Sequence, residues 1–144
     1  MASAIYNSFN TDVANGDIDL GADTFYIMLV TASYTVDVDN HDRRNDLTNE
    51  ITGTGYTAGG KALTSVTVTQ DNTNNLTKWD AADPSWGSAT FTARAAIIYK
   101  YTGTGAANDR LCVYLDFGAD KTVTAGTFPI TINSNGILQI KQGT

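Results

Sequence analysis

Short segments with a two-residue alternation of side chains recur along most of this chain, and they constrain its fold more than any other feature. Residues 62–70 read ALTSVTVTQ, in which Val66 and Val68 share one face while Ser65 and Thr67 share the other. An extended strand points successive side chains to opposite faces, so this pattern is typical of strands with one face buried. Turns rich in glycine, asparagine and aspartate separate the segments. The chain is therefore predicted to be built mainly from β-strands.

Seven strands are predicted, and turn residues separate them. They cover residues 24–31, 62–70, 76–81, 89–101, 110–117, 128–133 and 137–141. Asp71–Asn75 is expected to be a turn, and Asn135-Gly136 is a strong signal for a hairpin between the last two strands. No helical pattern alternates with the strands, which argues against a parallel α/β sheet. We expect an all-β fold, an antiparallel β-sandwich with a jelly-roll-like arrangement.

Residues 1–16 are predicted to form a short N-terminal helical segment, with the helix over residues 3–15. Tyr6, Phe9 and Val13 recur at spacings of three and four and form one apolar stripe. A helix this short is marginal alone, so the stripe is expected to dock on its own domain or on a neighbouring chain. The expected caps are Ser3 at its start and Gly16 at its end.

A long irregular connection, residues 33–60, follows the first strand. It has little strand signal, although residues 42–49 are compatible with a turn or two of helix. Connections of this length are uncommon in compact domains and tend to be functional. The connection ends in GTGYTAGG, a glycine-rich stretch that carries one large aromatic residue, Tyr56.

Length and composition indicate a single domain over residues 1–144. With 42% hydrophobic residues, a packed core is feasible. The lone Cys112 precludes an internal disulfide and favours folding in a reducing cytoplasm. No basic stretch followed by an apolar one opens the chain, so no signal peptide is expected. The longest apolar runs are too short to cross a bilayer. We expect a soluble protein without a membrane partner.

Charge is distributed unevenly along the chain. Residues 1–50 carry nine acidic side chains and two basic ones, whereas residues 51–144 are close to neutral. A chain with a formal net charge of −6 is a poor candidate for binding nucleic acid, because phosphate contacts need clustered lysine and arginine. The acidic half is interpreted either as a solubilising surface or as a surface that faces a basic partner.

Residues that carry chemistry are few. The acidic run near Asp37 does not match a calcium-binding EF-hand loop. Such a loop needs glycine at its sixth position and a carboxylate at its twelfth, and counted from Asp37 these positions are Asp42 and Thr48. The single His41 lies in a polar stretch without an evident nucleophile beside it. We therefore expect no enzyme and assign no catalytic, cofactor-binding or metal-binding residue.

Four other residues allow a structural interpretation. Trp79 and Trp86 flank Pro84, and as a pair they either stack on sugar rings or close one end of the sandwich. Cys112 alternates with apolar neighbours and is interpreted as a small packed residue. Arg94 lies on a strand face of small residues and is expected to pair with an acid across the sheet.

Four segments carry a resemblance to a known family. They are NGDIDLGADTFYIMLVT, GTGYTAGGKALTSVTV, TARAAIIYKYTGTG and LDFGADKTV, and the likeness extends from about Tyr6 to Leu138. They resemble small β-rich proteins encoded among the structural genes of tailed bacteriophages. Similar proteins act as capsid cement or decoration proteins. The resemblance implies a virion protein that is made in the bacterial cytoplasm, binds the outside of the major capsid protein lattice as a homodimer or homotrimer, and stabilises the shell. It carries no catalytic motif.

The sequence leaves other functions open. The alternative to capsid decoration is a tail or baseplate component that binds a receptor or carbohydrate, for which exposure of Trp79 and Trp86 is the discriminating observation. The N-terminal helix and the long connection are not needed to build the sandwich, so we expect them to make protein–protein contacts. Their aromatic and arginine side chains are the expected anchors. The predicted interface residues are Tyr6, Phe9, Tyr34, Arg43, Arg44 and Tyr56.

Overall fold

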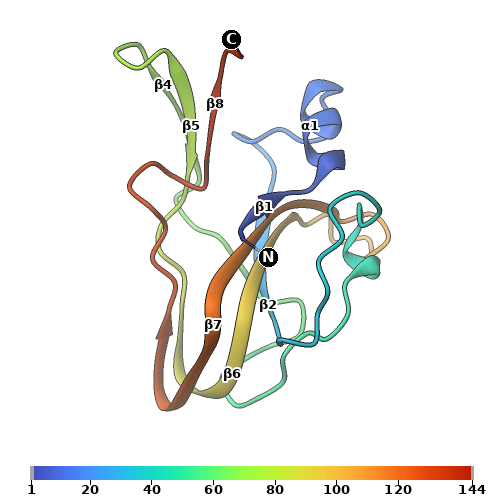
Figure 1. The fold of residues 1–144 in the computed structure, drawn as a ribbon, viewed down its shortest axis with the longest axis vertical. Helices are drawn as coiled ribbons and strands as arrows, with labels where there is room; N and C mark the ends of the chain where they lie inside the picture. The colour runs from blue at the N-terminus through green and yellow to red at the C-terminus, as the bar shows by residue number, and fades with distance from the viewer. Residues whose placement is uncertain (1, 144) are drawn as a thin grey trace.

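The computed structural model describes residues 2–143 of a mostly β chain with two antiparallel sheets and one short helix (Figure 1). Met1 and Thr144, the end residues of the predicted domain, lie outside the described residues. The five-stranded sheet has the order β1-β7-β6-β2-β3 and the three-stranded sheet the order β4-β5-β8. Their bounds are Ala4–Ile5 for β1, Phe25–Val30 for β2, Lys61–Ala62 for β3, Thr67–Asp71 for β4, Leu76–Asp80 for β5, Ser85–Lys100 for β6, Arg110–Pro129 for β7 and Leu138–Lys141 for β8.

A long hairpin of β6 and β7 dominates the five-stranded sheet. Both strands bend at the lower end of Figure 1, so that the start of β6 and the end of β7 lie beside the rest of the hairpin, on the left of the view. The pairing register shifts at several points along the hairpin, and Gly118 and Ala125 of β7 have φ angles of +77° and +47°. Such irregularities bend strands and increase their twist.

The two sheets meet at a shared apolar core. Trp79 from β5 is fully buried, with its ring centroid 4.9 Å from that of Phe25 in β2 and 6.1 Å from that of Phe9 in the helix. A second set of rings lies inside the bend of the long hairpin, where Phe91 and Phe128 are 5.1 Å apart. Since β4, β5 and β8 project beyond this core, the outer part of the three-stranded sheet is exposed (Figure 1).

The predicted strand over residues 62–70 is divided in two. Lys61–Ala62 pairs with β2 in one sheet, whereas Thr67–Asp71 pairs with β5 in the other. Between them Ser65 has a φ of +51°, a left-handed conformation that interrupts an extended run. The alternation of side chains is the same in a continuous strand and in two short ones, so it did not indicate that the chain passes from one sheet to the other.

The predicted hairpin across Asn135-Gly136 is wrong in its pairing. Residues 128–133 are not a separate strand, because Phe128 and Pro129 are the end of β7 and pair with Trp86 and Ser85. The last strand, β8, pairs with β5 instead. A turn does occur here, and Gly136 has the expected positive φ of +84°.

The N-terminal segment is helical over a shorter range than predicted. Helix α1 spans Asn7–Ala14 and follows the short strand β1. Its N-cap is Tyr6, which makes no side-chain cap hydrogen bond, and the Ser3 hydroxyl instead accepts a hydrogen bond from the N–H of Asp116. Gly16 takes the predicted left-handed conformation, with a φ of +79°.

Candidate protein-binding surface

The long connection is held to the edge of the five-stranded sheet along most of its length. Backbone bonds join Thr31 to Asn49 and Ile51 to Leu29. Between them the Tyr56 hydroxyl accepts a hydrogen bond from the Leu29 N–H at 3.0 Å and donates to a Glu50 carboxylate oxygen at 2.7 Å. The connection therefore adds backbone hydrogen bonds beside β2, beyond those that β2 makes with β3, and is not a free loop.

The glycine-rich end of this connection lies directly against neighbouring backbone. A Cβ atom on Gly60 would overlap the Ile27 carbonyl group and come within 2.7 Å of the Met28 Cα, and the φ of Gly60 is +79°. The Glu50 carboxylate also accepts the Gly59 N–H at 2.5 Å, while the Tyr99 hydroxyl donates to the Gly59 carbonyl at 2.6 Å. Only a residue without a side chain allows this approach.

An ion pair fixes the centre of the connection. The Arg44 Nε donates to the carboxylate of Asp109, a fully buried residue, at 2.7 Å. The other carboxylate oxygen of Asp109 accepts both the N–H and the hydroxyl of Thr102 at 2.8 Å. Burial lowers the pKa of Arg44, but its hydrogen bond with Asp109 and the nearby charges outweigh burial and raise the pKa overall. One carboxylate thus joins the connection to the loop between β6 and β7.

A chain of hydroxyl and imidazole groups fixes the start of the connection. The Tyr6 and Tyr34 hydroxyl oxygens are 2.9 Å apart, and the Tyr34 hydroxyl lies 2.9 Å from the His41 Nδ1. Burial, together with the Tyr34 contact, raises the pKa of the Tyr6 hydroxyl well above its usual range. His41 therefore takes part in a contact between the connection and the N-terminal segment.

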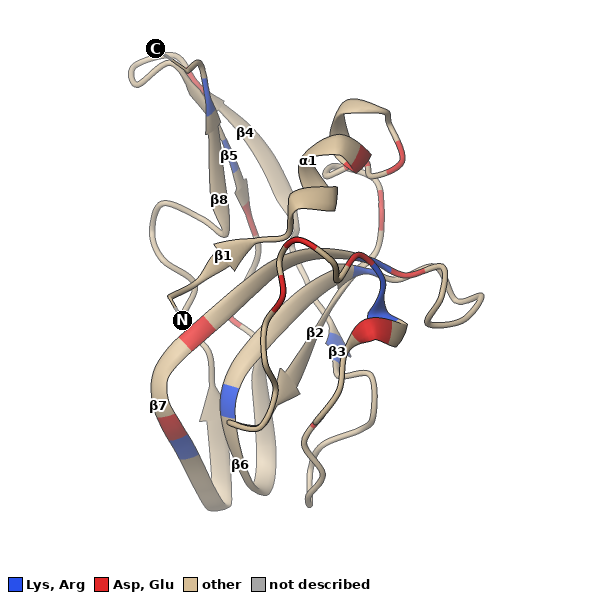
Figure 2. Cartoon of the chain, turned by 45° about the vertical axis from the view of Figure 1, so that its right-hand side comes forward, with Lys and Arg blue, Asp and Glu red and all other residues tan. Residues whose placement is uncertain are grey.

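Two acidic segments form one surface of the molecule. Residues 12–23, which include the end of α1 and its following loop, lie beside residues 37–46 (Figure 2). The Asn7 side-chain amide donates to Asp39 at 2.7 Å, and Arg43 approaches Asp12 at 3.9 Å. We call these two segments the acidic face.

Part of the acidic face is neutralised by arginine and lysine from the sheet. Arg110 pairs with Asp12 and, at 3.5 Å, with Asp17. Lys100 pairs with Asp23 at 2.8 Å. Within residues 2–143, four acids of the face make hydrogen bonds but no ion pair: Asp19, Asp37, Asp39 and Asp46. Asp46 accepts backbone N–H groups of Asp42 and Arg43, whereas Asp19 and Asp39 are exposed and Asp37 is partly exposed.

The carboxylates of the acidic face have local partners that preserve their charge. Asp37 accepts the N–H groups of Asp39 and Asn40 and the side-chain amide of Asn40, and these bonds lower the pKa of Asp37. Partial burial raises the pKa of Asp46, but hydrogen bonds from the backbone of Arg43 and Asp42 outweigh burial and lower it overall. The run that includes Asp37 is a hydrogen-bonded turn.

The predicted interface residues are divided between the core and the surface. Tyr6, Phe9 and Tyr34 are 0%, 2% and 7% exposed, so Tyr6 and Phe9 cover the chain's own core, an alternative that the sequence left open. Arg44 and Tyr56 make the internal contacts described above. Arg43 lies on the acidic face, 3.1 Å from Asp42, and its side chain is 25% exposed. The Arg44 side chain is 23% exposed, so the two arginines are similarly accessible.

The other residues singled out in the sequence have structural contacts. Trp79 and Trp86 are 0% and 4% exposed, so neither ring offers a platform for a sugar. Cys112 is buried, and burial raises the pKa of its thiol well above the usual range. Arg94 pairs across the sheet with Asp116 at 3.1 Å, as predicted.

Three comparisons were made for the chain. No protein-family model, no curated protein and no solved structure matches it. Among residues 2–143, no group of three or more histidine, cysteine, aspartate or glutamate side chains is placed to hold a metal ion. No helix in the described part of the chain has the length and apolar character needed to cross a membrane.

Stability is expected to fall in acid because several exposed carboxylates are hydrogen-bonded in the folded state. Hydrogen bonds from Asn74 lower the pKa of Asp71 below its ordinary value of 3.8. A carboxyl group with a lowered folded-state pKa stabilises the fold above its unfolded pKa, and this contribution is lost as the pH falls through the folded pKa. The thermal midpoint should therefore decrease below about pH 4.

The contribution of this turn can be isolated with one substitution. Asp71→Asn keeps an oxygen that accepts the Thr73 and Asn74 N–H groups but cannot titrate. The variant should show a shallower decrease in thermal midpoint on acidification than the unchanged chain. Identical slopes for the two proteins would contradict the assignment.

Proposed function

We propose that this chain is a capsid decoration protein that binds the outside of a phage major capsid protein lattice and stabilises the shell. The carrying observation is the acidic face, whose two segments are held in place by internal hydrogen bonds and ion pairs. The resemblance of the chain to small virion structural proteins of tailed phages supports the same function. Under this proposal the face binds a basic surface on the shell.

The way the acidic face is fixed supports binding of this kind. Ordering a loop on association costs free energy, and a surface that is already ordered avoids that cost. Glu50, Tyr56 and Arg44 order the connection before any partner is present. Complementary charge then selects the partner and speeds association. A shell offers many equivalent positions, so neighbouring copies held together bind more strongly than one copy alone.

The proposed architecture is a β-sandwich. Trp79 of the three-stranded sheet packs on Phe25 of the five-stranded sheet, and this contact between the two sheets supports the proposal. A jelly-roll arrangement of the strands is the finer proposal. In either case the acidic face lies outside the two sheets and leaves them free to act as a rigid support.

The test of this proposal removes charge from the acidic face and keeps its geometry. In the triple variant Asp19→Asn, Asp37→Asn and Asp39→Asn, each new side chain retains an oxygen that accepts the existing hydrogen bond. Exposed charge pairs contribute about 0.2–1 kcal/mol each, so apparent affinity for purified shells should fall about tenfold at low salt. Occupancy is measured by co-sedimentation with shells that lack the protein.

The matched control is Asp120→Asn, which removes an exposed charge from β7, away from the acidic face. It should leave occupancy unchanged. Added salt should weaken binding of the unchanged chain, because it screens exposed charges. Equal occupancy of the triple variant and the unchanged chain would remove the acidic face from the proposal.

A further inference from the structure

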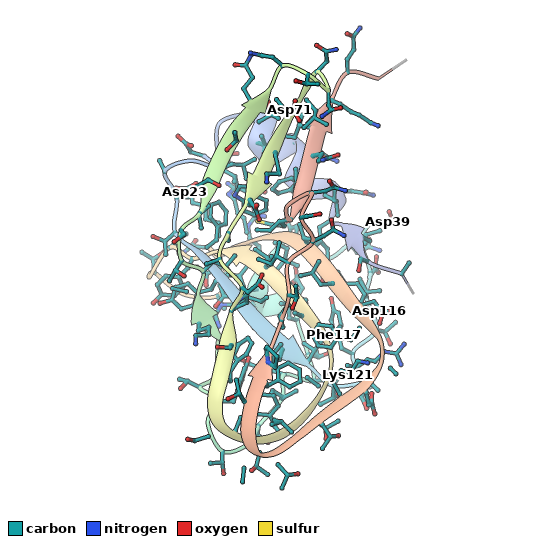
Figure 3. The ribbon with its side chains drawn as sticks, turned by 90° about the vertical axis from the view of Figure 1, so that its left-hand side faces the viewer. Asp23, Asp39, Asp71, Asp116, Phe117 and Lys121 are labelled. Carbon is teal, nitrogen blue, oxygen red and sulfur yellow. The ribbon has the colours of Figure 1, made fainter. Side chains whose placement is uncertain are left out.

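The three-stranded sheet has two open edges. Strands β4 and β8 each pair only with β5, and within residues 2–143 no backbone hydrogen bond joins the outer side of either strand to another segment. In Figure 3 the sheet projects from the body with β4 along one edge, β8 along the other and Asp71 at its tip. An open strand edge is a template for pairing with another chain.

Both edges carry an exposed apolar side chain on the same face of the sheet. Val68 in β4 and Ile140 in β8 are 45% and 46% exposed. Val68 lies opposite Trp79 of β5, and Ile140 lies opposite Thr77 of β5. Thr77 and Trp79 are two residues apart in one strand and share a face, so Val68 and Ile140 both lie on the face that carries Trp79. An apolar edge on each side of one sheet is unusual for a chain that remains alone.

An apolar groove borders the β4 edge. It has a volume of about 500 Å³ and lies between β4, the end of α1 and the loop that follows the helix. Its apolar side chains belong to Val13, Ile18, Leu20 and Val68, and Asp19 is in its lining. The occupant of this groove should therefore present aliphatic side chains and no acidic group.

The opposite edge of the same sheet has this chemistry. Strand β8 reads Leu-Gln-Ile-Lys, with exposed Ile140 and Lys141 and no acidic residue. The β4 edge carries Asp71 and is bordered by the acidic loop that contains Asp19. Asp71 and Lys141 both lie opposite Leu76, so they stand at the same level and on the same face of the sheet. The two edges are complementary in charge, and their levels match.

We propose that β8 of one copy of this chain pairs with β4 of the next copy, so that the three-stranded sheets join head to tail. Strands β4 and β8 are both antiparallel to β5 and hence run in the same direction, so the new pairing is parallel. If the paired strands keep the levels that they have within one copy, Leu138 of the first copy lies beside Val68 of the next copy, and Lys141 lies beside Asp71. Ile140 extends the apolar contact over the groove.

Symmetric pairing of identical edges fits the same residues less well. Two β8 edges would pair antiparallel, which places Lys141 of each copy beside Leu138 of the other, gives it no acidic partner and leaves the groove beside Val68 empty. Two β4 edges would bring together the acidic loops that contain Asp19. Only the pairing of unlike edges satisfies both charge and apolar contact, and a contact of this kind forms rings when its rotation closes.

The inference is tested on the purified chain without a shell, so its outcome is independent of the proposed function. Light scattering coupled to size exclusion should give a mass of more than two 15.3 kDa chains, because a head-to-tail contact does not stop at two copies. Val68→Asp and Ile140→Asp should each reduce the protein to a monomer. Both side chains are exposed, so thermal unfolding of each monomer should show an intact fold.

Mixing the two variants separates unlike pairing from like pairing. Each variant keeps one functional edge, β8 in Val68→Asp and β4 in Ile140→Asp, so an equimolar mixture should form a dimer and nothing larger. The control Thr124→Asp adds the same charge at an exposed position of β7 and should leave the oligomer intact.

Several results would overturn the inference. The unchanged chain could remain a monomer at every concentration, or either single variant could retain the full mass. A mixture that contains only monomers would also contradict it. If the isolated chain is a monomer and Val68→Asp lowers occupancy on shells, the β4 edge binds the shell protein instead of a second copy.

Discussion

Gly60→Ala is expected to destabilise the protein by more than about 4 kcal/mol, a loss that leaves little or no folded protein. Gly60 combines a left-handed φ of +79° with a position at which an added Cβ would overlap the Ile27–Met28 backbone. A methyl group there must push the connection away from β2, and Ile27 and Met28 are themselves fully or almost fully buried. Chemical denaturation, or the yield of folded protein where none survives, measures the effect.

Gly16→Ala is the matched control for this prediction. Gly16 has the same φ of +79°, but no atom lies within 4 Å of the position that its Cβ would occupy. Its replacement therefore costs only the left-handed conformation, about 1–2 kcal/mol. The difference between the two variants reports the close approach of the connection to β2, and equal losses would show that this approach does not exist.

Asp109→Ala is expected to cost about 3–5 kcal/mol, because it leaves buried groups without their partner. The carboxylate of Asp109 satisfies Arg44 on the connection and both polar groups of Thr102 in the loop between β6 and β7. Its removal should release both segments together. Hydrogen exchange should show loss of protection around Arg44 as well as around Thr102, which lie far apart in the sequence.

Asp42→Ala provides the comparison with an exposed pair. Asp42 lies 3.1 Å from Arg43, and its side chain is 52% exposed, so the pair contributes less than about 1 kcal/mol. A loss for Asp109→Ala no larger than that for Asp42→Ala would mean that the buried ion pair does not hold the connection in place.

The sequence predicted the local features of the fold. The alternation located most strands, Asn and Asp located the turn at residues 71–75, and Gly16 has the left-handed conformation expected after a helix. These features depend on a few consecutive residues. They are therefore readable without knowledge of the rest of the chain.

Pairing between distant segments was not predictable in the same way. The Asn135-Gly136 turn is correct, but the partner of β8 is β5, which lies some 60 residues earlier in the chain. Phe128 is instead held by Trp86 and Phe91 inside the bend of the long hairpin. Burial of that ring, and not the turn, decides where residues 128–133 lie.

The candidate surface shows the same division. The acidic composition of residues 1–50 was visible in the sequence, and the structure brings its two acidic segments together. The role of Arg44 was not visible, because its partner Asp109 lies 65 residues away. The exposure of Val68 and Ile140 was also hidden, since the same alternation describes a strand that covers a core and one that projects from it.

Imaging of purified phage particles with this chain labelled tests the proposed function most directly. Label should be distributed over the outer surface of the head, at positions repeated with the symmetry of the shell. Particles lacking the chain should lose shell integrity under lower stress than complete particles. Label confined to the tail or baseplate, with heads unmarked, would contradict the proposed function.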